Sequence, residues 1–126
     1  MDDKQKKYYH EMLERDRGYI FIKDNHVAAV VTFFVGDEDD EKYLFREPWT
    51  IVDDDPYGTT LYIDQLLVKD HSATKIIHKE FAIFLAFIKE AFPTIQRAKW
   101  VRVNAQFRKH GIKEGVKSNV HIKNLK

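Results

Sequence analysis

Hydrophobic and polar positions change their period along this chain, and each change marks a predicted element. Residues 61–70, LYIDQLLVKD, are apolar on both faces at their centre, which is typical of a buried strand. A polar turn, HSATK, follows, in which Asp70 or Ser72 is placed to cap the first amides of a helix. The next segment, IIHKEFAIFLAFIKEAF, stops at Pro93 and predicts a long, mostly buried helix.

This helix carries two apolar stripes, although covering one face of a sheet requires only one. The first stripe consists of Ile77, Phe81, Phe84, Leu85, Ile88 and Phe92. The second consists of Ile76, Ile83 and Phe87. Exposed apolar patches usually mark interfaces, so we expect another element or a partner to cover the second stripe. A homo-oligomer through Ile83 and Phe87 is one such arrangement.

The segments before residue 61 predict a helix and a hairpin. Residues 4–17 form an amphipathic pattern, with Gly18 where a left-handed C-terminal cap would stand. Residues 19–22 and 27–35 are apolar runs around an Asp-Asn pair, which is typical of a β-hairpin. Residues 42–60 contain Pro48, Pro56 and Gly58 and are the least regular part, with a short strand predicted at 49–52.

The segments after Pro93 predict two strands and one turn of helix. Residues 99–103 alternate apolar and basic side chains, as a strand does. Residues 106–110 have the length of one helical turn before Gly111, and residues 116–122 predict a final strand. We therefore expect a single α/β (α+β) domain over residues 1–126. Its sheet is mixed and largely antiparallel, with one long buried helix and a shorter N-terminal helix.

The formal net charge of +1 hides a strong asymmetry between the two halves of the chain. Residues 1–64 contain 8 Lys/Arg and 16 Asp/Glu, whereas residues 65–126 contain 13 and 4. The halves then differ by charges of −8 and +9, which predicts either two faces of opposite sign or halves that fold against each other. Segregated, solvated surface charge is the plain alternative.

Composition excludes several classes of function. The chain has no cysteine, so disulfides, thiolate zinc sites and a cysteine nucleophile are absent. No histidine stands in a metal-binding motif, so no metal site is expected. No apolar run reaches the ~18 residues of a membrane span, and the start lacks the apolar core of a signal peptide. We therefore expect a cytoplasmic protein without a membrane partner.

The order of predicted elements, together with the segments LLVKDHSATKIIHKEF and NAQFRKHGIKEGVKSNVHI, resembles the GNAT superfamily of acetyl-CoA-dependent N-acetyltransferases. The first segment is similar to the family's central strand, pyrophosphate turn and following helix, and the second to its C-terminal part. In size, and in lacking the family's first strand, the chain resembles short GNAT-like proteins of tailed bacteriophages. The resemblance implies the fold of an acyl-CoA-dependent N-acyltransferase, located in the host cytoplasm if the chain is phage-encoded.

The resemblance also implies where a coenzyme would bind. The cofactor-binding residues that it suggests are Leu66, Leu67, Val68, Ser72, Lys75 and Asn104. Asp64 is the only carboxylate in the central strand, where it would share a face with Tyr62, Leu66 and Val68. We consider it as a general base, or alternatively as an aspartate held by hydrogen bonds for structural reasons.

Two departures from the family pattern weaken the enzymatic interpretation. The family's turn carries Arg/Gln-x-x-Gly-x-Gly/Ala, but the corresponding places here hold Ala73, Ile76 and His78, or Ser72, Lys75 and Ile77 one residue earlier. Where many members have a tyrosine as general acid, this chain has Phe107, which cannot donate a proton. We therefore expect weak or absent acetyl-CoA binding, and a weakened or lost acyltransferase activity.

Two other functions remain alternatives on the same fold. One is a structural or assembly protein. The other is a nucleic-acid-binding protein that uses the basic stretch 97–126, from Arg97 to Lys126, because basic side chains interleaved with aromatic ones hold phosphates and stack bases.

Overall fold

A computed structural model describes residues 2–38, 41–70, 74–101 and 120–125. Its helices are α1 (Asp3–Glu14) and α2 (Thr74–Ala91), with a 3-10 turn, η1 (Glu41–Tyr43). Its strands are β1 (Gly18–Lys23), β2 (His26–Gly36), β3 (Thr60–Val68), β4 (Arg97–Val101) and β5 (Val120–Asn124). They form one sheet in the order β1-β2-β3-β4-β5, in which only β3 and β4 run parallel.

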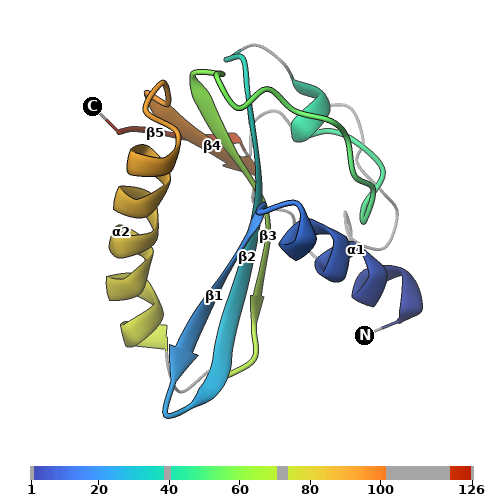
Figure 1. Cartoon of the computed structure of the whole chain (residues 1–126), viewed down its shortest axis with the longest axis vertical. Coiled ribbons are helices and arrows are strands. Elements are labelled where there is room, and N and C mark those ends of the chain that lie inside the picture. The colour runs from blue at the N-terminus through green and yellow to red at the C-terminus, as the bar shows by residue number, and fades with distance from the viewer. Residues whose placement is uncertain (1, 39–40, 71–73, 102–119, 126) are drawn as a thin grey trace.

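The two helices cover opposite faces of this sheet (Figure 1). The α2 side holds one core cluster, in which Phe84, Leu85 and Ile88 pack on Val31, Phe33 and Leu61. The α1 side holds a second cluster, built around Tyr8, Met12, Phe34 and Tyr62. The mixed, largely antiparallel sheet, the long helix and the shorter N-terminal helix are therefore as the sequence predicted.

The hairpin of β1 and β2 confirms the expectation drawn from the Asp-Asn pair. Asp24 and Asn25 have φ angles of 51° and 65°, both in the left-handed region that tight hairpin turns require. β3 and β4 pair in parallel, with Thr60 opposite Arg97 and Ile63 opposite Trp100. α2 lies between them in sequence and returns the chain to start a parallel neighbour.

The ends of α1 differ in part from the expectation. Asp2 accepts a hydrogen bond from the Gln5 amide at 2.8 Å, and the Gln5 side chain accepts from the Asp2 amide at 3.3 Å, which forms a capping box. The helix stops at Glu14, and the left-handed residue after it is Asp16, with a φ of 57°. The assignment of Gly18 as that cap was wrong, because Gly18 already begins β1.

The predicted strand at residues 49–52 is also wrong. The structure shows no strand pairing there, although Trp49, Ile51 and Val52 do pack against the α1-side core. β2 is already paired on both of its edges, with β1 and β3, so this segment finds no free edge beside it. Its apolar side chains therefore fill the core from a loop.

This loop returns to the sheet at a close approach of two glycines. A Cβ added to Gly58 would lie 2.4 Å from the Gly36 carbonyl oxygen and 2.6 Å from the Gly36 Cα. Real Cβ atoms do not approach backbone so closely, and neither backbone can move without disturbing β2 or β3. Only glycine therefore fits at position 58.

Gly58→Ala should lower the free energy of unfolding by about 3 kcal/mol, because the methyl group forces the two backbones apart. Gly18→Ala is the matched control, since its Cβ would meet mainly the end of the flexible Leu13 side chain, at 2.7 Å. Urea unfolding of both variants measures the difference. Equal losses in the two variants would show that the contact between Gly36 and Gly58 does not constrain the loop.

Candidate functional site

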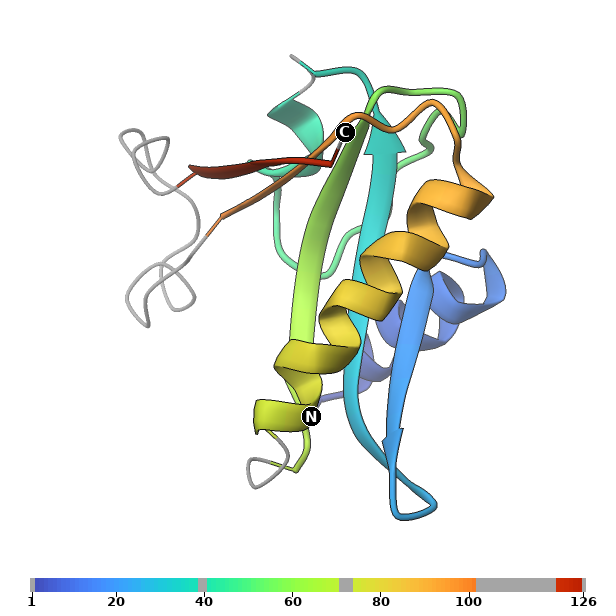
Figure 2. The same cartoon turned by 90° about the vertical axis from the view of Figure 1, so that its left-hand side faces the viewer.

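The strands β3 and β4 separate halfway along β3. The part of β3 beyond this separation is the candidate site. Their pairing ends at Ile63 and Trp100, although β3 continues to Val68. Beyond Ile63, β3 pairs only with β2 among the residues that the structure describes, with Val68 opposite Ala29. Figure 2 shows β4 and β5 turning away from β3 at this level. One edge of residues 64–68 is thus left without a strand neighbour in the described chain.

Three of the predicted cofactor-binding residues, Leu66, Leu67 and Val68, lie along this free edge. Leu66 is half-exposed, which is unusual for a leucine in a central strand. Leu67 packs with the α1-side cluster and Val68 with the α2-side cluster. Ser72 and Asn104 lie outside the described residues, as does the side chain of Lys75.

A β-bulge sits where the two strands separate. Thr32 of β2 pairs with Gln65 and Phe33 pairs with Ile63, so Asp64 is an extra residue on β3. A bulge of this kind places two successive residues, Asp64 and Gln65, on the α1 side of the sheet. The expectation that Asp64 shares a face with Leu66 and Val68 was therefore wrong, because the extra residue reverses the alternation beyond it.

Asp64 is bound by Arg46 in a largely buried, bidentate ion pair. Arg46 Nη1 donates to Asp64 Oδ1 at 2.9 Å and Nη2 donates to Oδ2 at 2.7 Å. The two side chains are only 11% and 10% exposed. Two parallel charge-assisted bonds in a site of low dielectric give a strong and geometrically specific interaction.

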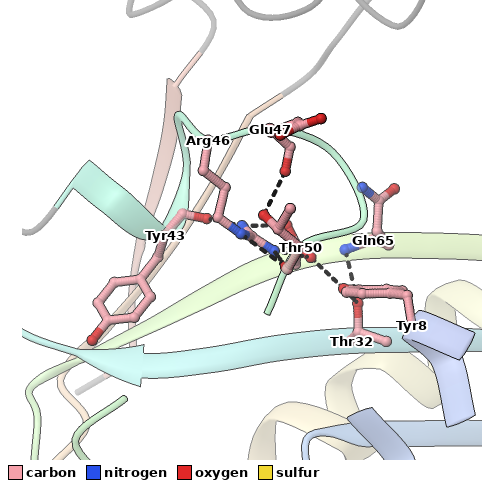
Figure 3. Close-up of polar contacts among 8 residues, drawn as sticks. Tyr8, Thr32, Tyr43, Arg46, Glu47, Thr50 and Gln65 are labelled. Atoms are coloured by element: carbon pink, nitrogen blue, oxygen red, sulfur yellow. Dashed lines mark hydrogen bonds and ion pairs between the residues drawn. The ribbon is translucent and has the colours of Figure 1, made fainter. Parts of the chain in front are cut away.

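Arg46 also binds the loop that carries it. Its guanidinium donates to the Tyr43 carbonyl at 2.7 Å and twice to the Thr50 carbonyl, at 2.8 and 3.1 Å. It lies over the Phe34 ring, with 4.6 Å between Cζ and the ring centroid. Figure 3 shows the guanidinium pointing from its loop toward Thr50 and the sheet. One side chain therefore ties the irregular segment after η1 to β2 and β3.

Tyr8 of α1 completes this network from the other side. Its hydroxyl donates to Asp64 Oδ2 and lies 2.5 Å from Thr32 Oγ1, while Thr32 Oγ1 accepts from the Gln65 amide at 3.2 Å. The Tyr8 and Thr32 side chains face each other beside Gln65 in Figure 3. Burial, followed by the Asp64 charge and hydrogen bond, raises the pKa of Tyr8 well above its usual value. Tyr8 therefore stays neutral and donates.

The geometry bears on the two roles considered for Asp64. Arg46 occupies both carboxylate oxygens and Tyr8 occupies one of them a second time. A general base needs an oxygen that can take a proton from the substrate, within hydrogen-bond reach. The catalytic role stays a prediction, whereas the contacts are those of an aspartate that joins elements of the fold.

Sequence reasoning did not find Arg46, Tyr8 or Thr32. A carboxylate at the centre of a buried strand does signal that a cation or several donors must lie nearby. The two partners of Asp64, Arg46 and Tyr8, however, stand 18 and 56 positions away in sequence, and Arg46 comes from the segment with the weakest periodicity. Only the assembled fold shows which of the basic residues fills the role.

The acidic and basic halves of the chain meet at β4. Arg97 forms an ion pair with Glu38 at 3.2 Å, and Lys99 donates to the Glu38 carbonyl at 2.6 Å. Of the two charge arrangements considered, halves folded against each other fits these contacts. The nucleic-acid surface predicted for residues 97–126 stays a prediction, because residues 102–119 lie outside the described part of the chain.

The described residues contain no group of three or more histidine or carboxylate side chains that could hold a metal ion. Asp70, considered as a helix cap, lies 3.2 Å from His26 Nε2, and Ser72, the other residue considered, lies outside the described residues. Nor is any helix of the described chain both long and apolar enough to span a bilayer.

Asp64→Ala should lower the free energy of unfolding by about 3–5 kcal/mol, because it leaves the buried Arg46 charge without its partner. Replacing both residues, as in Arg46→Met with Asp64→Leu, should recover most of that loss. Asp53→Ala is the control, since it removes the exposed ion pair with Arg15 and should change nothing measurable. Urea unfolding measures the free energy of unfolding of each variant. A double variant as unstable as Asp64→Ala would contradict the account.

The raised pKa of Tyr8 predicts how stability depends on alkaline pH. Below about pH 10 the tyrosine is neutral in both states, so its contribution is complete. Above that pH the unfolded state loses the proton while the folded state keeps it, so stability falls as the pH rises. Melting temperatures measured from neutral to strongly alkaline pH should show this fall, and Tyr8→Phe should reduce it. An unchanged slope in Tyr8→Phe would show that other groups cause it.

Comparison with known proteins identifies the fold. No protein-family model matches the sequence. No curated protein matches it either. Among solved structures, the GNAT-like decarboxylase GphF in complex with isobutyryl-CoA matches with a TM-score of 0.51 and 18% identity, over 80% of this chain and 53% of that one. The chain thus spans about half the length of GphF.

A second solved structure covers nearly the whole chain. The GNAT family N-acetyltransferase YhbS of Escherichia coli, in complex with CoA, matches with a TM-score of 0.59 and 15% identity, over 99% of this chain and 69% of that one. At such low identity the likeness concerns the backbone alone. This chain has the fold of the GNAT N-acetyltransferases.

Proposed function

We propose that this protein is an acyl-CoA-binding member of the GNAT fold whose N-acyltransferase activity is weakened or lost. The observation that carries the proposal is the free edge of β3 at residues 64–68, opened by the early end of its pairing with β4. The proposed likeness to short phage GNAT-like proteins belongs to this proposal and rests on the sequence alone.

The free edge suits the extended arm of coenzyme A. That arm contains two amide groups, which can pair with the backbone of a strand in the manner of an added strand. Leu66 offers a half-exposed apolar side chain beside that edge, against which an acyl chain or the arm itself can pack. Both similar structures contain a CoA compound, which supports the assignment of ligand class.

The contact expected to be weakest is the one between this chain and the diphosphate of coenzyme A. A turn before a helix binds phosphates through converging backbone amides, and glycine allows the closest approach. Between Val68 and the first turns of α2, the chain has no glycine. Losing three charge-assisted bonds at ~1.5 kcal/mol each weakens binding about a thousandfold, which turns a micromolar site into a millimolar one.

Catalysis lacks its usual groups as well. In the transfer, the amine nitrogen attacks the thioester carbonyl, the carbon–sulfur bond breaks, and the thiolate takes a proton while the amine loses one. Asp64, the only carboxylate of β3, is engaged by Arg46 and Tyr8, and Phe107 cannot supply the proton. Positioning on the free edge is therefore what this chain retains.

The first test is a thermal-shift titration with acetyl-CoA and with free coenzyme A. A ligand at a hundred times its dissociation constant adds ~2.7 kcal/mol to stability. We therefore expect no shift in melting temperature at micromolar acetyl-CoA and an upward shift only at millimolar concentrations. A saturated shift in melting temperature at micromolar acetyl-CoA would contradict weakened binding of the diphosphate. No shift at any concentration would contradict acyl-CoA binding altogether.

The second test restores the missing glycines. Ala73→Gly with Ile76→Gly should tighten acetyl-CoA binding by about tenfold or more, because backbone amides can then reach the phosphates. Ala82→Gly, at an exposed position of α2, is the control and should cost the same kind of helix stability without changing affinity. Calorimetric titration measures both. Equal affinity in the two variants would remove the turn as the cause of weak binding.

A further inference from the structure

The outer edge of β1 is a further strand edge that has no strand neighbour among the residues that the structure describes. β1 is the terminal strand of the sheet, and within the described residues it pairs only with β2. Natural proteins usually protect such an edge with charged residues, prolines or a covering loop. Residues 18–22, GYIFI, contain neither a charge nor a proline. The last residue of β1, Lys23, is charged, so residues 18–22 are the part of this edge that lacks the side chains that keep a strand from pairing.

Apolar side chains are exposed on both faces beside this edge. On the α1 side, Ile20 and Ile22 are 38% and 58% exposed. On the α2 side, Ile83 and Phe87 are 52% and 51% exposed. The Phe87 ring lies 5.6 Å from the Tyr19 ring of β1, which places the exposed stripe of α2 next to the same edge. Figure 2 shows α2 crossing in front of the sheet toward β1.

We propose that β1 pairs antiparallel with β1 of a second copy of this chain, which joins two sheets into one continuous sheet. A two-fold axis perpendicular to the sheet makes the contact isologous, so each copy offers the same surface. The same axis places corresponding faces of the two sheets on the same side, so the Ile20 and Ile22 side chains of both copies meet there. The two α2 helices approach each other on the other side, through Ile83 and Phe87.

The register of this pairing follows from side-chain direction and charge. Opposed residues must point to the same face, which allows Ile20, Phe21 or Ile22 to lie opposite itself in the partner. With Ile20 at the centre, Lys23 would face Arg17 and Asp24 would face Asp16, and like charges directly opposed are destabilising.

With Ile22 at the centre, Asp24 would instead face the apolar Ile20. With Phe21 at the centre, Ile20 lies opposite Ile22, Tyr19 lies opposite Lys23, and Asp24 lies opposite Gly18, beside Arg17. Of the three registers, this one alone opposes neither like charges nor an apolar side chain to a carboxylate. A second copy is therefore a self-complementary occupant of the edge.

Engineered cysteines test this register, because the chain has none of its own. Opposed residues of antiparallel strands have Cα atoms at separations that a disulfide spans. An equimolar mixture of Ile20→Cys and Ile22→Cys should form a disulfide-linked dimer under mild oxidation, and each variant alone should cross-link at least about tenfold more slowly. Tyr57→Cys is the control, at an exposed position in the loop between β2 and β3. It should cross-link no faster than expected from random collisions between exposed thiols.

Sedimentation equilibrium tests the dimer without engineered cysteines. The unaltered chain should dimerise by high-micromolar concentration. Ile22→Lys and Phe87→Asp should each raise the dimer dissociation constant by about a hundredfold, because symmetry introduces each charge twice. Tyr57→Lys should leave it unchanged, and circular dichroism of all variants verifies folding. A monomer at high-micromolar concentration, or cross-linking by Ile20→Cys alone as fast as by the mixture, would overturn the proposal.

Discussion

The structure depends on one buried charge in the middle of a sheet. A carboxylate in a central strand is costly unless strong donors surround it, and Asp64 receives both arms of Arg46 and the hydroxyl of Tyr8. The three residues come from β3, from the loop after η1 and from α1. Because Arg46 also binds two carbonyls of its own loop, this side chain ties the segment with the least regular structure to the sheet.

The same position determines where the sheet opens. Asp64 is the extra residue of the bulge in β3, and the pairing of β3 with β4 stops one residue before it. A bulge bends its strand and increases the local twist, which carries the rest of β3 away from β4. The ion pair on one face and the free backbone edge beyond it therefore share a cause. The Arg46–Asp64 pair holds the bent strand, and the bent strand presents the edge on which we place acyl-CoA.

The sequence predicted those parts of the fold that depend on period and on turn chemistry. Alternation and the Asp24-Asn25 turn give the hairpin, and the long apolar stripe gives α2, because each of these signals is local. The prediction failed where one inserted residue or one left-handed residue changes the geometry. The bulge at Asp64 reversed the faces beyond it, and Asp16 took the left-handed position expected of Gly18.

The candidate site shows the same division. Leu66, Leu67 and Val68 were proposed to bind the cofactor because they belong to a strongly patterned strand, and that role stays a prediction. Among the described residues they lie on the part of β3 that pairs only with β2. Arg46 and Tyr8 were not predicted, because a tertiary ion pair leaves no mark at a fixed spacing. The unpaired edge of β1 depends on which strand ends the sheet, which the order of elements along the chain does not specify.

The most direct test of the central claim is an amide NMR titration of the unaltered protein with acetyl-CoA. The account predicts shifts at the Leu66, Leu67 and Val68 amides that saturate only at millimolar ligand, while the Tyr8 and Asp64 amides change little. Saturation of these shifts at micromolar acetyl-CoA would contradict the weakened binding of the coenzyme. Shifts concentrated away from β3 would contradict the site itself.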